Sequence, residues 1–295
     1  MKKLLTLCLV LACCLLGSYY IAEAAPPAAD VHWGYSGEAG PAHWGELDPS
    51  FVACAEGQEQ SPVDIPASAP VNTTGLAFHY QPSGLTILNN GHTIQVNYDK
   101  GSAITLEGTT YDLVQFHFHA PSEHTLAGQS APMELHLVHR STNQTLAVVG
   151  VLIQRGGANP AYDAVLNHLP AQEQAAMPVA GVTVDAASLL PADRSYYRYN
   201  GSLTTPPCSE GVKWQVLRTP VTLSDAQIAA FTKLYPNDAR PVQPLNARTF
   251  LTVGSAPVGM PTTGHGEHAL LLVLLSYAAL GLIVAGGVLL QRKKA

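Results

Sequence analysis

The chain has 295 residues, of which 47% are hydrophobic and 12% are charged, and its formal net charge is −6. This length fits one large domain or two ordinary ones. Residues 25–268, which lie between two apolar ends, hold 10 of the 15 basic and 20 of the 21 acidic side chains, a balance near −10. A basic footprint is missing, so the composition argues against a nucleic acid partner.

The first 24 residues predict a secretory signal. They begin with Lys2 and Lys3, continue through an apolar run, and end in the small-residue site Ala22-Glu23-Ala24. We therefore expect the following domain to be extracytoplasmic, in the periplasm or at the cell surface.

The elements that follow are mainly strands. Alternation of apolar and polar residues predicts strands over 85–98 (with a turn at 89–92), 103–106, 110–118, 196–205 and 211–217, and a hairpin turn at 107–109. A dense apolar run predicts a buried strand over 146–154. Helical spacing predicts short helices at 160–169 and 224–235, the second capped by Ser224. Residues 32–45 predict an irregular aromatic segment. Because no repeat or internal boundary occurs, we expect one β-dominated domain over 30–254.

One of these strands carries an unusual set of polar side chains. Side chains two apart in a strand lie on the same face, so the run 113–119 presents Gln115, His117 and His119 together. The residues between them are apolar and face the other way. This pattern predicts a polar site on one face of the strand and a core on its back.

A second strand-like run, 134–139, completes the site. It places Glu134, His136 and Val138 on one face. If the two strands pair, three imidazoles converge on one point, and Gln115 and Glu134 are placed to accept their second ring N–H groups. Three neutral imidazoles with an open fourth position are one ligand set of a catalytic zinc site, so we expect Zn²⁺ as the cofactor.

Cysteine usage fits an exported domain. Three of the five cysteines lie in the predicted signal, which leaves Cys54 and Cys208. Two cysteines in such a domain favour one disulfide, and two free buried thiols are the alternative.

The C-terminal end predicts an anchor. Residues 269–290 carry no charge and are long enough to cross a bilayer of about 30 Å, and the basic tail 291–295 would stay on the cytoplasmic side. The polar spacer 255–268 contains Met260-Pro261-Thr262-Thr263-Gly264, which resembles a sortase cell-wall sorting signal with Met in place of the usual Leu. Two outcomes stay open: attachment to the cell wall, or a plain transmembrane helix.

Several motifs together resemble the α-class carbonic anhydrases. They are QSPVDI at 60–65, LNNGH at 88–92, QFHFH at 115–119, PSEHT at 121–125, ELHLVH at 134–139, GSLTTPPCSEGVKW at 201–214 and RPVQPLN at 240–246. The matches run from about 33 to 250, in the order of the family. The resemblance implies a large central, twisted, mostly antiparallel sheet with zinc at the floor of a conical cleft. It also implies reversible hydration of carbon dioxide to bicarbonate and a proton.

The resemblance further implies roles for individual residues. His117, His119 and His136 match the zinc ligands, and Gln115 and Glu134 match the acceptors behind them. Thr204 matches the hydroxyl that accepts from zinc-bound hydroxide, Glu123 the carboxylate that fixes Thr204, and His92 the proton shuttle. The polar wall that orders water matches Tyr35, Asn90, Gln95 and Thr205, and the apolar wall where carbon dioxide sits matches Val138, Val148, Leu203 and Trp214. Cys54 and Cys208 match a disulfide of bacterial-type and secreted members.

Two departures and two alternatives accompany this resemblance. The segment between His119 and Glu123 is short, as in bacterial-type members, and Gln95 stands where many members have Asn. One alternative is a cupin-like metal oxidoreductase, although Tyr111 stands where that motif has Gly. The other is a non-catalytic surface binding module on the same scaffold, which the loss of a ligand His would indicate. The sequence leaves the oligomeric state open.

Overall fold

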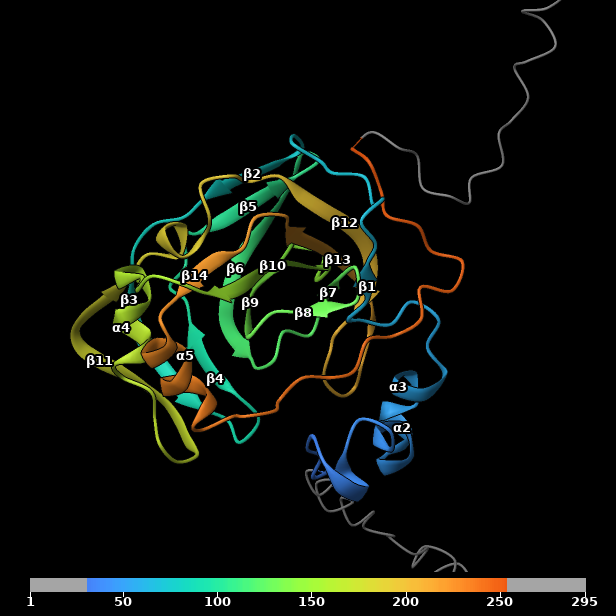
Figure 1. The fold of residues 1–295 in the computed structure, drawn as a ribbon, viewed down its shortest axis with the longest axis horizontal. Coiled ribbons are helices and arrows are strands. Elements are labelled where there is room, and N and C mark those ends of the chain that lie inside the picture. The colour runs from blue at the N-terminus through green and yellow to red at the C-terminus, as the bar shows by residue number, and fades with distance from the viewer. Residues whose placement is uncertain (1–30, 254–295) are drawn as a thin grey trace, which may run out of the picture. The chain divides into compact units, whose positions relative to one another are not determined.

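A single large sheet organises the protein (Figure 1). Eight of its eleven strands follow one path, in the order β11 (Gln174–Val184), β3 (Ser83–Asn89), β4 (Ile94–Asn97), β6 (Thr109–His119), β9 (Met133–Arg140), β10 (Leu146–Arg155), β13 (Glu210–Leu217) and β12 (Tyr196–Ser202). Strands β2 (Leu76–His79), β5 (Ala103–Leu106) and β14 (Val221–Leu223) branch from it. The pairings of β10 with β13 and with β14 are parallel and the others in this sheet are antiparallel, as expected.

The computed structural model describes residues 31–253. The predicted signal (1–24), the spacer (255–268), the apolar segment (269–290) and the basic tail (291–295) lie outside the described residues. Within 31–253, no helix is both long enough and apolar enough to span a bilayer.

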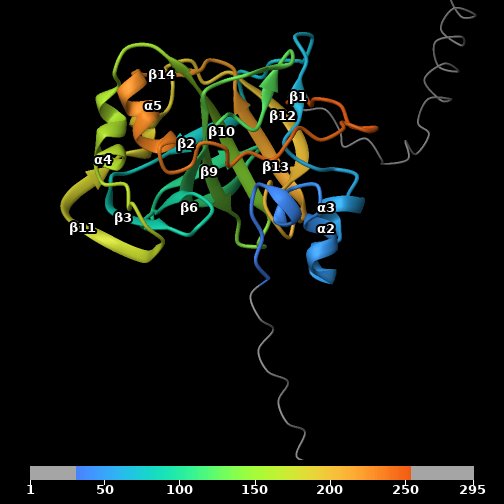
Figure 2. The same cartoon turned by 60° about the horizontal axis from the view of Figure 1, so that its bottom comes forward.

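The remaining elements are short. A small sheet joins β1 (Asp64–Ile65), β7 (Thr125–Leu126) and β8 (Gln129–Ser130). Helical turns near the N-terminus are η1 (Gly37–Ala39), α2 (Trp44–Leu47), η2 (Pro49–Phe51) and α3 (Ala53–Glu56). Later ones are η3 (Pro160–Tyr162), α4 (Asp163–Leu166), η4 (Ala186–Leu189) and α5 (Asp225–Thr232). Figure 2 shows α4 and α5 on one side of the sheet, near β11, and α2 and α3 on the other.

Both faces of the central strands are buried. Seven of the eight residues of β9 are buried or half-buried on alternating sides, and β10 is buried from Ala147 to Ile153. On one side, Phe118 packs near Tyr162 of η3 and Phe231 of α5. On the other, Val148 belongs to a cluster that also contains Trp214. The centre of β9 is therefore shielded from water on both faces, which suits a buried polar site only if its groups are paired.

Local chemistry explains the elements that the sequence predicted well. The hairpin between β5 and β6 has a two-residue loop in which Glu107 (φ 48°) and Gly108 (φ 82°) are both left-handed, as a type I′ turn requires. Helix α5 is capped by Ser224, which accepts from the N–H of Gln227 in a capping box, as predicted.

Other expectations need correction. The predicted strand 196–205 ends at Ser202, so Thr204 and Thr205 lie in the loop that follows it. The predicted helix 160–169 is a 3₁₀ turn and a four-residue helix that ends at Leu166. The segment 32–45, predicted to be irregular, contains η1 and the start of α2. Strand β11 was not predicted, because its side chains are exposed on both faces and show no alternation.

A disulfide joins Cys54 of α3 to Cys208 in the loop between β12 and β13. This confirms the predicted pairing and removes the alternative of two free thiols. Together with the buried Trp44, the two half-cystines form a second small core beneath the N-terminal segment.

Candidate metal centre

The pairing of β6 with β9 brings the predicted histidines together. His117 lies directly opposite His136, and His119 lies opposite Glu134. Residues directly opposite each other in an antiparallel pair share a face, so the three imidazoles meet there. A register shift between Leu113 and Gln115 means that the strict alternation expected from residue 113 begins only at Gln115.

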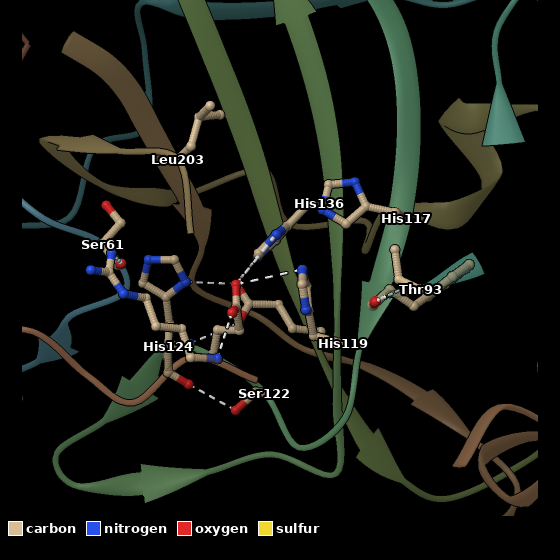
Figure 3. A network of polar contacts seen from close by, with 12 residues as sticks. Ser61, Thr93, His117, His119, Ser122, His124, His136 and Leu203 are labelled. Atoms are coloured by element: carbon tan, nitrogen blue, oxygen red, sulfur yellow. Dashed lines mark hydrogen bonds and ion pairs between the residues drawn. The ribbon is translucent and has the colours of Figure 1, made fainter. Parts of the chain in front are cut away.

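The three rings face one another around a common centre (Figure 3). The centroid of His119 lies 5.0 Å from that of His117 and 4.8 Å from that of His136, and the third separation is 5.3 Å. One nitrogen from each ring can be chosen so that all three lie within 4.8 Å of one another. This spacing allows one ion to contact all three rings.

The second nitrogen of each ring meets an acceptor. His117 Nδ1 lies 2.8 Å from Gln115 Oε1, and His136 Nε2 lies 3.0 Å from Glu134 Oε1, the two partners predicted from the strand pattern. The Glu134 contact has the length but not the angle of a hydrogen bond. His119 Nδ1 donates to the main-chain oxygen of Asp238 at 2.7 Å, a partner that the sequence did not indicate.

The remaining nitrogens are available to a metal. His119 Nε2 is buried and has no hydrogen-bond partner among the described residues, and Glu123 Oε2 lies 3.5 Å from it. Burial lowers the pKa of His117 well below its ordinary value and that of His136 to about 4, so both rings are neutral at pH 7. Orphaned buried nitrogens are costly, and three neutral imidazoles are a zinc ligand set. The residues present therefore fit zinc.

A second trio, His124, Glu134 and His136, is also closely spaced. Both nitrogens of His124 are already occupied, Nδ1 by Glu134 Oε1 at 2.7 Å and Nε2 by the hydroxyl of Tyr199 at 2.6 Å. His124 is therefore a support for Glu134. Its main-chain N–H also donates to Glu134 Oε2 at 2.8 Å, which leaves the carboxylate held from both sides.

A glycine on the neighbouring strand leaves room for the carboxylate of Glu134. Gly150 of β10 lies opposite His136, and a Cβ added there would lie 2.9 Å from Glu134 Oε1. Glycine at this position leaves room for the carboxylate. The strand pattern did not point to Gly150, His124 or Tyr199 as part of the site. His124 lies in the PSEHT motif, so a signal for it was present.

Glu123 lies beside the three imidazoles and is fully buried. Its Oε1 accepts the main-chain N–H of Arg240 at 2.8 Å. Burial raises its pKa to about 8, and the hydrogen bond from Arg240 N–H and the neighbouring side chain of Thr204 oppose this rise. Oε2 has no partner that meets hydrogen-bond geometry among the described residues. A cation bound nearby would lower this pKa.

The four residues predicted to form the apolar wall pack in one hydrophobic cluster. Val148 and Trp214 are buried members of it, and Val138 and Leu203 are half-buried and pack against it. The ring centroid of Trp214 lies 4.9 Å from that of His136, so the cluster borders the three imidazoles.

The predicted polar residues are more scattered. Gln95 of β4 lies opposite His117 and donates to Asn97, which places it next to the centre. Asn90 uses its side-chain oxygen to accept from the N–H groups of His92 and Thr93, so it shapes the turn between β3 and β4. Thr205 is half-buried, and its main-chain oxygen accepts from Cys208 N–H.

Tyr35 and His92 pack against two tryptophans of the N-terminal segment, Trp33 and Trp44. The ring of His92 stacks on that of Trp33, with centroids 3.6 Å apart and planes 7° apart. Tyr35 contacts Trp33 and Trp44 edge to face, and its hydroxyl is buried without a partner among the described residues. Burial lowers the pKa of His92, and the nearby His32 lowers it further. The described contacts do not link His92 to the three imidazoles.

Comparison with known proteins gives a consistent result. The sequence model of the eukaryotic-type carbonic anhydrases matches residues 39–253. A carbonic anhydrase of Nostoc sp. is 45% identical over 75% of this chain and 86% of its own length, and one of Pectobacterium carotovorum is 41% identical over 85% and 100%. The structure of an α-carbonic anhydrase from Thermovibrio ammonificans with the inhibitor sulfanilamide is 42% identical, with a TM-score of 0.72 over 75% of this chain and 99% of that one. Dioscorin complexed with ascorbate is 31% identical, with a TM-score of 0.69 over 76% and 100%.

Proposed function

Because this chain belongs to the eukaryotic-type carbonic anhydrase family, we propose that it catalyses the reversible hydration of carbon dioxide to bicarbonate and a proton, with Zn²⁺ as its metal. One observation carries the proposal: three imidazoles, two buried and one half-buried, converge, each with its second nitrogen directed at an acceptor. The family match removes the cupin-like alternative.

His117, His119 and His136 would hold the ion through the nitrogens that face the centre. Zinc held in this way lowers the pKa of a bound water to about 7, a value already known from carbonic anhydrases themselves. The acceptors behind the rings keep each imidazole in one tautomer and one orientation.

Thr204 and Glu123 would orient the attacking oxygen. A hydroxyl can accept a hydrogen bond from that oxygen only if its own proton is directed elsewhere. The side chain of Thr204 adjoins Glu123, whose carboxyl group is in turn fixed by Arg240 N–H. We infer that the Thr204 hydroxyl donates to Glu123 and accepts on the side of the metal centre.

The apolar cluster would receive the substrate. Carbon dioxide is small and has no net charge, so it is best held by apolar contact rather than by a charged side chain. Val138, Val148, Leu203 and Trp214 supply such a surface next to His136. Gln95, Asn90, Thr205 and Tyr35 would order water on the polar side.

His92 would carry the proton away. Its ordinary pKa near 6.5 suits transfer at neutral pH, and burial lowers it somewhat. The stack on Trp33 gives the ring one defined resting position on the turn between β3 and β4.

A direct test uses residues 25–268. The wild-type protein is expected to bind one zinc per chain and to hydrate carbon dioxide, and His119→Ala is expected to lose both properties. Zinc content and the rate of carbon dioxide hydration are the measurements. Hydration that persists undiminished in His119→Ala would refute the mechanism, and zinc binding without hydration in the wild type would favour the binding-module alternative.

We also propose that the enzyme faces outward and is tethered at its C-terminus, since 1–24 has the pattern of a signal and 269–290 that of a membrane span. Protease added to spheroplasts should then digest the domain, and it should spare a cytoplasmic control protein. Replacing Thr263-Gly264 with Ala-Ala separates the two anchors, because only cell-wall attachment by a sortase requires these residues. Protection of the domain in spheroplasts, to the same extent as the cytoplasmic control, would contradict the outward placement.

A further inference from the structure

Asp238 makes three separate hydrogen bonds to the two residues at the end of β6. Its main-chain oxygen accepts from His119 Nδ1 at 2.7 Å. Its main-chain N–H donates to Ala120 O at 3.0 Å, and its side-chain Oδ1 accepts from Ala120 N–H at 2.7 Å. Residues 119 and 120 are thus held by one residue that lies far away in the sequence.

The first of these bonds decides which nitrogen of His119 is free. A carbonyl oxygen can only accept, so Nδ1 must carry the proton and Nε2 must keep its lone pair. Nε2 is the buried atom without a hydrogen-bond partner that faces the centre. The position of the Asp238 carbonyl therefore controls how this ring is presented to a metal.

The carbonyl needs support because no regular element provides it. Asp238 lies in an irregular stretch after α5, where no helix or strand fixes the main chain. The side chain is buried, with 1% of its surface exposed, and the bond from Oδ1 to Ala120 N–H closes a small ring with the main-chain bond. Two residues further on, Arg240 N–H holds Glu123. One short segment thus supports both a ligand and the carboxyl group beside it.

We propose that Asp238 is a positioning residue of the metal centre, and that its side chain acts by accepting the Ala120 N–H, which fixes the carbonyl that orients His119. The inference rests on the proposed function only in taking zinc as the metal. The part played by the side chain is that of a hydrogen-bond acceptor, and its charge is not required.

Three variants separate these possibilities. Asp238→Asn keeps an acceptor oxygen without the charge, and Asp238→Ala removes the acceptor. Asp185→Ala is the matched control, since Asp185 Oδ1 also accepts a main-chain N–H, from Ala187 at 2.9 Å, at the start of η4. Asp238→Ala is expected to weaken zinc affinity by about 10-fold, the lower end of the usual effect of losing a partner behind a ligand, because the main-chain carbonyl remains but loses its support. Asp238→Asn and Asp185→Ala should stay close to the wild type in chelator competition.

Nitrogen NMR of the metal-free proteins gives a second readout. The wild type should show His119 protonated at Nδ1, and Asp238→Ala should show a mixture of tautomers. This measurement tests the wild type even if Asp238→Ala fails to fold. An Nε2-protonated His119 in the metal-free wild type would overturn the proposal. Equal zinc affinity in Asp238→Ala and Asp185→Ala, or an equal loss in Asp238→Asn, would also overturn it. Both readouts are independent of carbon dioxide hydration, so a failure of the proposed activity is seen separately.

Discussion

Burial lowers the pKa of four histidines of this protein that have different surroundings. At the metal centre, burial lowers the pKa of His117 and His136 and keeps both rings neutral, so their nitrogens can bind a cation. Burial also lowers the pKa of His139, whose ring is not part of the metal centre. At His92, which is half-buried on the turn between β3 and β4, burial lowers the pKa as well. The roles are therefore separated by what surrounds each ring: the other two imidazoles at the metal centre, Tyr80 beside His139, and Trp33 beside His92.

His92→Ala should slow carbon dioxide hydration in weakly buffered solution by roughly 100-fold, the lower end of the range for a positioned proton-transfer group. Added imidazole should restore the rate, because it supplies the missing carrier. Stopped-flow hydration assays at two buffer concentrations measure the effect. His79→Ala, at an exposed histidine of β2, is the control and should match the wild type. A rate in His92→Ala that does not respond to imidazole would count against the shuttle.

His139 predicts a pH dependence of stability. Its ring is fully buried, Tyr80 Oη lies 2.8 Å from Nε2, and burial lowers its pKa to about 3. The unfolded chain binds a proton near pH 6.5 and the folded protein does not. Stability is therefore lost as the pH falls from 6.5 toward 3, by up to about 1.4 kcal/mol per pH unit.

Urea unfolding of the wild type and of His139→Gln between pH 7 and pH 4 measures this contribution. Glutamine does not titrate, so the variant should lose less stability over this range than the wild type does. The comparison cancels the carboxyl groups that titrate in both proteins. Parallel curves for the two proteins would show that His139 does not contribute.

Among the strands and helices, the features that the sequence predicted are those that depend only on the spacing of residues within one element. The faces of β6 and β9 follow from the two-residue period of a strand, and Gln115 and Glu134 are each two residues from the histidine that they support. Asp238 could not be predicted in this way, because it lies 119 residues from His119 and contacts this ring through its main-chain oxygen. Strand β11 gave no signal because it is exposed on both faces, and α2 and α3 because four residues are too few to show a helical period.

The disulfide connects the unpredicted α3 to the loop after β12, across 154 residues of sequence. Cross-linking restricts the unfolded chain, so the double variant Cys54→Ser/Cys208→Ser should lose about 2–5 kcal/mol of unfolding free energy. Urea unfolding of the domain measures the loss. Reductant should destabilise the wild type to a similar extent and leave the double variant unchanged. A wild type and a double variant of equal stability would contradict the prediction.

At the scale of the whole molecule, the metal centre and the fold share the same core. The ligands lie on the central strands β6 and β9. The segment around Asp238, which is far from these strands in sequence, contacts the ligand His119. The rings and carboxylates are positioned only when these parts are assembled, so the unfolded chain offers no comparable site. Metal binding must therefore favour the folded state.

Zinc should raise the stability of the wild-type domain by about 2.7 kcal/mol when the free ion is about 100 times its dissociation constant, because it binds the folded state only. Thermal unfolding with zinc, and after removal of zinc by a chelator, measures the shift. His119→Ala, which lacks one ligand, should show little shift, and His79→Ala should behave as the wild type. Equal shifts in His119→Ala and the wild type would place the stabilising ion elsewhere, because a site that loses one of three nitrogens binds zinc much more weakly.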